Sequence, residues 1–280
     1  MLFFNTGIIG FPLKHSLSPL LHNFFIYHTG VNGGYCCFEV SKAENLPKTL
    51  SFLKESGFVG LNVTLPYKTD IMKYTDETDA VASEIGAVNT LLLNESGIFG
   101  VNTDVYGIEK TFEHYGVSCL DKDILVLGAG GSTKALLYYL KYQNYKSLTI
   151  ANRTPVKAEK MLAHFGLNKS RTKEIESLKK YNEYDIIINT TSAGLEGGRF
   201  LDMSNIKCRE FAFDFQYSGN LTPFLKEYYK QNIICSDGLM MLIYQGVESF
   251  YRWAEDILVT KQVNFENELE ILKKKLRRSV

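Results

Sequence analysis

The stretch 123-DILVLGAGGSTKALLYYL-140 decides the fold class of this chain. Its first five residues are typical of a buried strand, GAGG is a glycine turn, and the residues that follow have the apolar spacing of an amphipathic helix. A strand, a glycine turn and a helix in this order form the first half of a βαβ unit. The stretch therefore predicts an α/β protein.

The glycine turn also predicts a ligand. Gly128 permits a tight turn, and Gly130 and Gly131 allow backbone N–H groups to approach a pyrophosphate at the helix N-terminus. Thr133 stands where the dinucleotide fingerprint GxGxxG has its third glycine, so the match is imperfect. A turn without a ligand is the structural alternative. The place of the motif between a strand and a helix favours nucleotide binding.

Strand-like and helix-like patterns alternate along the whole chain, which predicts largely parallel sheets. One helix is expected to open at Ser18-Pro19 with the serine as its N-cap, and a long helix is expected from Gly238 onward. Further strands, some with the turn that follows them, are expected near residues 3–9, 34–40, 58–64, 89–94, 99–104, 147–154, 184–194, 210–217 and 233–237, and a helix over 155–164.

Length and composition exclude several classes of protein. A chain of 280 residues suggests about two domains. Its 31 acidic and 31 basic residues balance, which argues against a nucleic-acid surface. Five cysteines without a CxxC motif favour a reduced, cytoplasmic protein with no zinc site. The apolar start lacks the basic segment of a signal peptide, and no apolar run approaches the ~20 residues that span a membrane.

The second strand of the predicted βαβ unit indicates which dinucleotide binds. NAD sites usually carry Asp or Glu at its end to bind the ribose 2′-hydroxyl, whereas NADP sites offer a cation to the 2′-phosphate. This chain has Asn152, Arg153 and Thr154 there, and Arg153 is the first arginine in the sequence. A guanidinium binds phosphate in a bidentate manner. The sequence therefore predicts NADP(H), with a chance placement of Arg153 as the alternative.

The stretch 61-LNVTLPYK-68 places a lysine where a helix would disfavour it. A strand is expected to end near Thr64, and Pro66 predicts the first turn of a helix, whose partial positive charge Lys68 would oppose. Asp104 likewise follows a predicted strand. Strand C-termini share one edge in open α/β sheets, and ligands bind at that edge. The two residues are therefore catalytic candidates, with a solvated lysine and a helix-capping aspartate as the alternatives.

These motifs occur together in an order that resembles the shikimate dehydrogenase family. The resemblance implies NADPH-dependent, reversible reduction of 3-dehydroshikimate to shikimate in aromatic amino-acid biosynthesis. It also implies a substrate domain formed by residues 1–104 plus 238–280, with a Rossmann NADP-binding domain over 105–237. The matching segments are FPLKHSLSPLLHN, GLNVTLPYK, GAVNTL, NTD, GAGGSTKA, NRT, NTTSAG and DGLMMLIYQG.

Carried onto matching positions, the resemblance assigns a role to individual residues. It implies that Lys68 is the acid/base and Asp104 its catalytic partner, and it implies no metal ligand. The expected substrate-binding residues are Ser16, Ser18, Thr64, Asn89, Tyr217 and Gln245. The expected cofactor-binding residues are Gly128, Ala129, Gly130, Gly131, Asn152, Arg153, Thr154, Lys157, Thr191 and Gly238. The expected partner is a small-molecule substrate, without nucleic acid or membrane, and the chain is expected to be a monomer or a homodimer.

Residue chemistry supports part of this assignment independently. No arginine precedes residue 153 to bind a substrate carboxylate, so hydroxyls from Ser16, Ser18 and Thr64 are a plausible substitute. A helix-capping role is the alternative for Ser18. Two departures from the family pattern are Val105 after NTD and Met240 in DGLMML. The alternative functions are a quinate or dual quinate/shikimate dehydrogenase and, more distantly, a non-catalytic sensor. Such a sensor should lack Lys68, Asp104 or the glycine turn.

Overall fold

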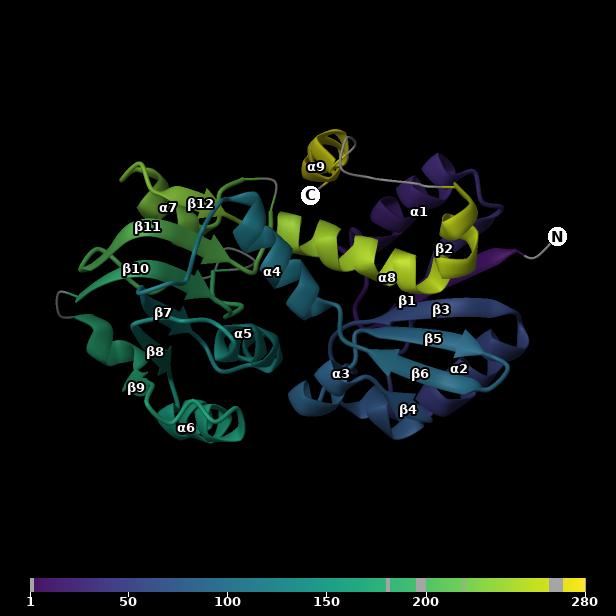
Figure 1. The fold of residues 1–280 in the computed structure, drawn as a ribbon, viewed down its shortest axis with the longest axis horizontal. Helices are drawn as coiled ribbons and strands as arrows, with labels where there is room; N and C mark the ends of the chain where they lie inside the picture. Colours follow the sequence, from purple (N-terminus) through teal and green to yellow (C-terminus); the bar gives the residue numbers. More distant parts are fainter. Residues whose placement is uncertain (1–2, 180–181, 195–199, 219, 262–268, 280) are drawn as a thin grey trace. The chain divides into compact units, whose positions relative to one another are not determined.

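The chain forms two compact units in a computed structural model that describes residues 3–179, 182–194, 200–218, 220–261 and 269–279. Unit 1 comprises Met1–Gly107 and Leu242–Val280, and unit 2 comprises Ile108–Met241 (Figure 1). Two helices carry the chain from one unit to the other, α4 (Asp104–His114) and α8 (Leu239–Lys261). The sheets described below confirm the predicted α/β class, with a Rossmann-type sheet in the second unit.

Unit 1 contains a six-stranded sheet in the order β2-β1-β3-β5-β6-β4. The sheet is mixed rather than largely parallel, because β5 runs antiparallel to both of its neighbours. Two reversals leave β3 and β6 pointing the same way, so their C-terminal ends share one edge. The strands are β1 (Phe4–Gly10), β2 (Gly33–Glu39), β3 (Phe58–Val63), β4 (Glu77–Thr78), β5 (Thr90–Asn94) and β6 (Gly97–Val101).

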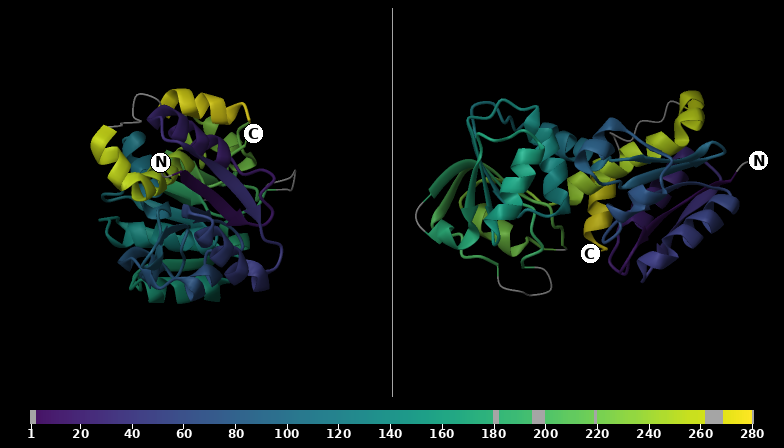
Figure 2. Two further views of the ribbon diagram at one scale, coloured as in Figure 1. Left: turned by 90° about the vertical axis from the view of Figure 1, so that its right-hand side faces the viewer. Right: turned by 90° about the horizontal axis from the view of Figure 1, so that it is seen from below.

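Alternation along β3 gives the unit 1 sheet two different faces. Leu61 and Val63 join the buried cluster that includes Leu50 of α2 (Leu46–Glu55). On the other face, a Cβ at Gly60 would come within 2.1 Å of the Trp253 ring nitrogen, so only glycine lets α8 approach this closely. That nitrogen donates to the Leu91 carbonyl oxygen at 2.9 Å. Figures 1 and 2 show α8 and α2 on opposite faces of the sheet.

The remaining helices of unit 1 cover the same two faces. Helix α1 (Ser18–Thr29) lies beside α9 (Leu269–Arg277), whose Lys275 ammonium is 5.0 Å from the ring centre of Phe24 (Figure 2). The shorter elements are η1 (Ala43–Asn45), η2 (Asp70–Tyr74) and α3 (Ala80–Ile85). No helix in the described part of the chain is long and apolar enough to cross a membrane.

Unit 2 contains an all-parallel sheet in the order β12-β11-β10-β7-β8-β9. Read from β9, the order is the 3-2-1-4-5-6 of dinucleotide-binding folds, and it reverses between β7 and β10. Ligands bind at that switch point, beyond the strand C-termini. The strands are β7 (Asp123–Leu127), β8 (Ser147–Asn152), β9 (Arg171–Glu174), β10 (Asn182–Asn189), β11 (Ile206–Asp214) and β12 (Ile234–Ser236).

The helices of unit 2 pack on both faces of this sheet. Phe211 and Phe213 of β11 contact Phe112 of α4 on one face, whereas Ala212 joins a buried cluster with Phe224 on the other. The helices are α5 (Gly131–Lys141), α6 (Pro155–His164), α7 (Pro223–Tyr229) and η3 (Ile175–Lys179). Sequence patterns did not predict β9, which is polar throughout, or the seven-residue α7.

The predicted helix at Pro66 is wrong. Residues 65–69 form successive turns, and the next helix is the short η2, which starts at Asp70. Tyr67 is 3% exposed, and its hydroxyl donates to the Val40 carbonyl oxygen at 2.5 Å. Anchoring this ring in the core holds the segment as turns. Lys68 therefore does not lie in the first turn of a helix, and no helix dipole disfavours its positive charge.

Candidate active site

One edge of the unit 1 sheet gathers the predicted catalytic residues. Lys68 follows β3, Asn89 precedes β5, and Asp104 follows β6. These three positions meet because β3 and β6 end, and β5 begins, at the same edge. The Val88 backbone N–H donates to the Lys68 carbonyl oxygen at 2.7 Å, which ties the turn after β3 to the start of β5.

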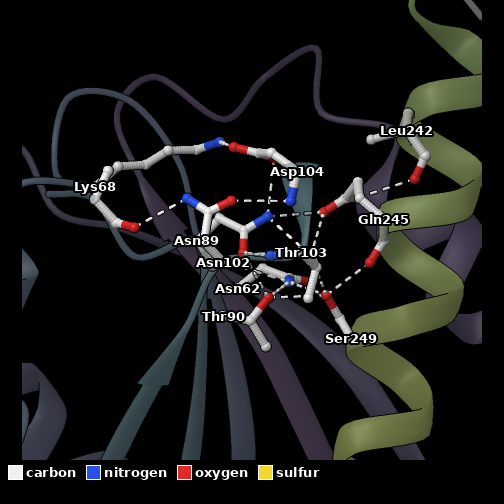
Figure 3. A network of polar contacts seen from close by, with 11 residues as sticks. Asn62, Lys68, Asn89, Thr90, Asn102, Thr103, Asp104, Leu242, Gln245 and Ser249 are labelled. Carbon is white, nitrogen blue, oxygen red and sulfur yellow. Dashed lines mark hydrogen bonds and ion pairs between the residues drawn. The ribbon is translucent and has the colours of Figure 1, made fainter. Parts of the chain in front are cut away.

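Lys68 and Asp104 form an ion pair at this edge (Figure 3). The Lys68 Nζ lies 2.6 Å from the Asp104 Oδ2, and the two side chains are 26% and 11% exposed. The other carboxylate oxygen, Oδ1, accepts from the Asn89 Nδ2 at 2.9 Å. Both oxygens are thus bound by side chains, and no contact described for the carboxylate is a cap of the α4 backbone. The capping alternative for Asp104 is therefore not supported.

The amide of Asn89 can adopt only one orientation. Its Oδ1 accepts from the Thr103 backbone N–H at 2.8 Å, so its Nδ2 must face Asp104. Gln245 of α8 lies beside it, with its Oε1 3.3 Å from the Asn89 Nδ2. The Gln245 Nε2 donates one hydrogen to the Leu242 carbonyl oxygen at 2.9 Å, which leaves its second N–H for another acceptor.

The three predicted hydroxyl residues follow β1 and β3 at the same edge. Strands β1 and β3 are parallel and in register up to Ile9 and Val63, and the chain past β1 stays paired with Leu65 through the Phe11 backbone N–H. Ser16 lies in the connection after β1, Ser18 begins α1, and Thr64 follows β3. The structure therefore brings these residues to one end of the sheet.

Ser18 does not cap α1 as predicted. The N-cap is Leu17, and no side chain caps the helix. The Ser18 backbone N–H donates to the Ser16 Oγ at 3.3 Å, so the Ser16 hydroxyl hydrogen remains free to donate. Ser18 is 6% exposed and lies close enough to Tyr35 to oppose, in part, the rise that burial causes in the pKa of that phenol.

The glycine turn in unit 2 has the geometry that a pyrophosphate site requires. Gly128 has φ +105°, and a Cβ there would lie 2.8 Å from the Thr190 Oγ1. By contrast, Cβ atoms at Gly130 and Gly131 would meet nothing within 4 Å. Thr133 replaces the third glycine without disrupting the turn, since its Oγ1 accepts from the Gly130 backbone N–H at 3.0 Å and lies 2.7 Å from the Thr190 Oγ1.

The end of β8 presents the predicted phosphate-binding residues. Arg153 and Thr154 are exposed, as is Lys157 in the first turn of α6. The Asn152 Nδ2 donates to the Thr154 carbonyl oxygen at 2.9 Å and so fixes this turn. Within the described residues, Arg153 forms no ion pair, and no carboxylate follows β8 before α6. These features suit a 2′-phosphate better than a 2′-hydroxyl.

The other predicted residues of unit 2 are Ala129, Thr191, Tyr217 and Gly238. Ala129 lies in the glycine turn, and Thr191 follows β10 on the far side of the switch point, with its Oγ1 donating to the Asn189 Oδ1 at 2.7 Å. Packing alone requires glycine at position 238, because a Cβ there would lie 2.2 Å from the Phe215 carbonyl oxygen. Tyr217 is half-buried after β11, and its contact with substrate stays a prediction.

Sequence patterns missed the buried polar residues that support the site. Behind Asn89 lie Asn62 and Thr90 of the sheet and Ser249 of α8, all buried, and Asn102 supports Asp104 by accepting from its backbone N–H at 3.0 Å. Such residues could have been recognised as polar residues at positions where strand alternation or helix spacing predicts a buried, apolar side chain. Asn62 has this property in β3, and Ser249 has it one helical turn after Gln245.

We predict that Gly128→Ala destabilises unit 2 while Gly131→Ala does not. Alanine at position 128 is strained at φ +105° and collides with Thr190, at a cost of about 1–3 kcal/mol. Alanine at 131 points into open space at the start of α5, where it favours the helix. Thermal unfolding of the two variants measures the difference, and equal midpoints would contradict the structural role of Gly128.

Comparison with known proteins identifies the family. The model of the shikimate dehydrogenase substrate binding domain matches residues 8–91, and that of shikimate / quinate 5-dehydrogenase matches residues 109–199. The shikimate dehydrogenase (NADP(+)) of Methanococcus maripaludis is 38% identical over 266 residues, covering 91% of this chain and 94% of the relative. That of Caldanaerobacter subterraneus is 39% identical over 255 residues, covering 88% and 90%.

A solved structure agrees over the full length. Shikimate 5-dehydrogenase from Thermus thermophilus, determined in complex with NADP(H) and shikimate, has a TM-score of 0.85 and 29% identity, covering 99% of this chain and 100% of that chain. The described residues contain no group of three or more His, Cys, Asp or Glu side chains that could hold a metal ion. Fold, sheet-edge geometry and sequence similarity agree, and this chain belongs to the shikimate dehydrogenase family.

Proposed function

We propose that this protein catalyses the reversible, NADPH-dependent reduction of 3-dehydroshikimate to shikimate. The observation that carries the proposal is the Lys68–Asp104 ion pair, oriented by Asn89 at a sheet edge that also bears Ser16, Thr64 and Gln245. The named functions of the relatives support this reaction. The nicotinamide supplies the hydride to the carbonyl carbon, and the protein must supply a proton to the carbonyl oxygen.

Lys68 is the proposed proton donor. An ammonium has three N–H groups, and Asp104 is the only described residue that the Lys68 ammonium contacts. Two N–H groups therefore remain for the oxygen that becomes negative as hydride is transferred. The ammonium stabilises that oxygen and then protonates it, and the neutral amine accepts the proton in the reverse reaction. Asp104 keeps the ammonium at a fixed place because Asn89 restrains its carboxylate.

The hydroxyl-bearing residues are proposed to bind the substrate carboxylate. Ser16 supports this role because its oxygen already accepts from the Ser18 backbone, which leaves its hydrogen for an anion. Thr64 contributes a second hydroxyl from the end of β3. Ser18, which begins α1 and is 6% exposed, is proposed as a third hydroxyl donor to the carboxylate. The free N–H of Gln245 and the half-buried Tyr217 are proposed partners of the substrate hydroxyls.

Unit 2 is proposed to bind NADP(H) through the switch point of its sheet. The open space at Gly130 and Gly131 accommodates the pyrophosphate against the α5 N-terminus, and Ala129 precedes them in the same turn. Arg153 and Lys157 provide positive charge for the 2′-phosphate, on a turn that Asn152 and Thr154 hold. Thr191 and Gly238 are proposed to border the nicotinamide. The protein is expected in the cytoplasm, as a monomer or homodimer.

The activity assay separates this proposal from its alternatives. We expect turnover of shikimate with NADP⁺. Turnover with NAD⁺ should be slower or absent because Arg153 is present and no acidic residue competes with it, and turnover of quinate should be slower or absent because the presence of both Ser16 and Ser18 fits shikimate. Comparable turnover of quinate and shikimate would indicate a dual-specificity enzyme. Binding of shikimate without turnover under any of these conditions would indicate a sensor and would refute the proposed catalytic role.

Lys68→Ala should lower kcat by about two orders of magnitude or more, because the group that stabilises and protonates the oxygen is lost. The KM for NADPH should stay within about twofold, since the proposed cofactor residues lie in unit 2. Lys73→Ala is the matched control, because it removes a lysine ion-paired at 2.5 Å to Asp70 in the following η2. A Lys68→Ala kcat within threefold of the wild-type value would sink the assignment.

Arg153→Asp should raise the KM for NADPH far more than the KM for NADH. The substitution removes the cation proposed to bind the 2′-phosphate and adds a carboxylate that can bind a 2′-hydroxyl. Arg171→Asp is the matched control, because Arg171 is also exposed but pairs with Thr149 within β8, away from the C-terminal end of β8 that Arg153 follows. Steady-state kinetics with both cofactors provide the test. Equal effects on the two KM values would contradict the role of Arg153.

A further inference from the structure

The side chains that bind Asp104 rest on a second layer of polar groups in the core of unit 1. Ser249 and Thr90 are 0% exposed and Asn62 is 5% exposed (Figure 3). Figure 3 shows Ser249 on α8, pointing at the strands that carry the other two residues. An apolar residue would be the ordinary occupant of position 249, because α8 packs here on the sheet. A buried hydroxyl at this point therefore requires an explanation.

The Ser249 hydroxyl is the hub of this layer. Its Oγ donates to the Gln245 carbonyl oxygen at 2.9 Å and accepts from the Asn62 Nδ2 at 3.1 Å. The Oγ1 atoms of Thr90 and Thr103 lie 2.8 and 3.1 Å from it. A hydroxyl has one donor and two acceptor positions, so with Gln245 and Asn62 bound, Thr90 and Thr103 share the one acceptor position that remains. Ser249 thus joins α8 to β3, β5 and the residue that precedes Asp104.

Thr103 connects this hub to the proposed active site. Its Oγ1 accepts from the Asn89 Nδ2 at 2.9 Å, so its own hydrogen must point elsewhere. The acceptors within reach are Ser249 at 3.1 Å, the Asn89 Oδ1 at 3.3 Å and the Gln245 Oε1 at 3.4 Å, of which Ser249 is the nearest. Ser249 therefore sets the rotation of the Thr103 hydroxyl, which in turn holds the amide that orients Asp104.

Asn62, which contacts Ser249 from β3, is itself held in one orientation. The Tyr35 hydroxyl donates to the Asn62 Oδ1 at 2.7 Å, which turns the Asn62 Nδ2 toward Ser249 and Thr90. The His22 ring stacks on Tyr35 with centroids 4.4 Å apart and planes 7° apart, which restrains the phenol. The orientation of the Asn62 amide is therefore fixed, and Ser249 is the member of the layer that contacts both Thr103, which supports Asn89, and the Gln245 carbonyl oxygen.

We propose that Ser249 is a positioning residue for the reaction assigned above, on which this inference rests. It does not touch substrate. It holds Gln245 through the backbone of α8 and Asn89 through Thr103, so that the amides reach substrate and Asp104 from fixed directions. Without this hydroxyl, Asn62, Thr90 and Thr103 each lose a buried partner, and the two amides lose their shared support.

The test replaces Ser249 with alanine and compares it with Thr29→Ala. Thr29 is a matched control because it is 4% exposed on α1 of the same unit, and its Oγ1 likewise donates to a helix carbonyl oxygen, that of Phe25, at 2.9 Å. Both variants should lower the thermal midpoint. Only Ser249→Ala should lower kcat/KM for shikimate, by about tenfold, with the KM for NADP⁺ within about twofold of wild type.

A mutant cycle distinguishes positioning from general destabilisation. Because Ser249 acts through both Gln245 and Asn89, its removal should cost less than about threefold in kcat/KM when both Gln245 and Asn89 are already alanine. A full tenfold loss in that background, or wild-type kinetics in Ser249→Ala, would overturn the proposal. Should Ser249→Ala not fold, Ser249→Cys keeps the volume and a weak donor, and the same two outcomes apply to it. A wild-type enzyme without turnover would refute the proposed function instead.

Discussion

The partly exposed Lys68 ammonium, the proposed proton donor, can act on a substrate only if the Asp104 carboxylate that pairs with it is held in place, and that requirement organises the polar groups of unit 1. A buried carboxylate is tolerated when its oxygens are hydrogen-bonded. Asp104 meets this condition through Lys68 and Asn89. Asn89 is in turn restrained by Thr103, and Thr103 by Ser249. Hydrogen-bonding the Asp104 carboxylate at the sheet edge thus involves a layer of polar side chains that extends into the core.

The two units position ligands by the same rule with different sheets. In unit 2, parallel strands separate at the switch between β7 and β10, which opens a site for a dinucleotide at the α5 N-terminus. In unit 1, two antiparallel pairings invert the direction twice and return β6 parallel to β3. The result in each case is a set of strand ends that share one edge. The chemistry then depends on the few side chains placed just beyond those ends.

Much of this arrangement was predictable because it follows from local patterns. The glycine turn, Arg153 after β8, and Lys68 and Asp104 beyond strand ends all follow from short-range chemistry, and the α/β class was confirmed. The helix at Pro66 was wrong because burial of Tyr67 overrides the local preference. Ser18 is not the N-cap of α1, because the helix begins at Ser18, one residue earlier than predicted, and Leu17 is its N-cap. Asn62 and Ser249 could not be paired from sequence, since they stand 187 positions apart in the chain and meet only in the folded protein.

Helix α8 has a consequence for how the protein is made. Unit 1 is discontinuous: its first 107 residues are separated from its last segment, which starts at Leu242, by the whole of unit 2. Translation therefore delivers an incomplete unit 1 whose β3 exposes Gly60 and Asn62 until Trp253 and Ser249 emerge. Unit 2 can complete its sheet first, while unit 1 waits for the final helix. Residues that support the proposed site are then among the last to be assembled, so a chain released early has Lys68 and Asp104 but lacks Gln245 and Ser249.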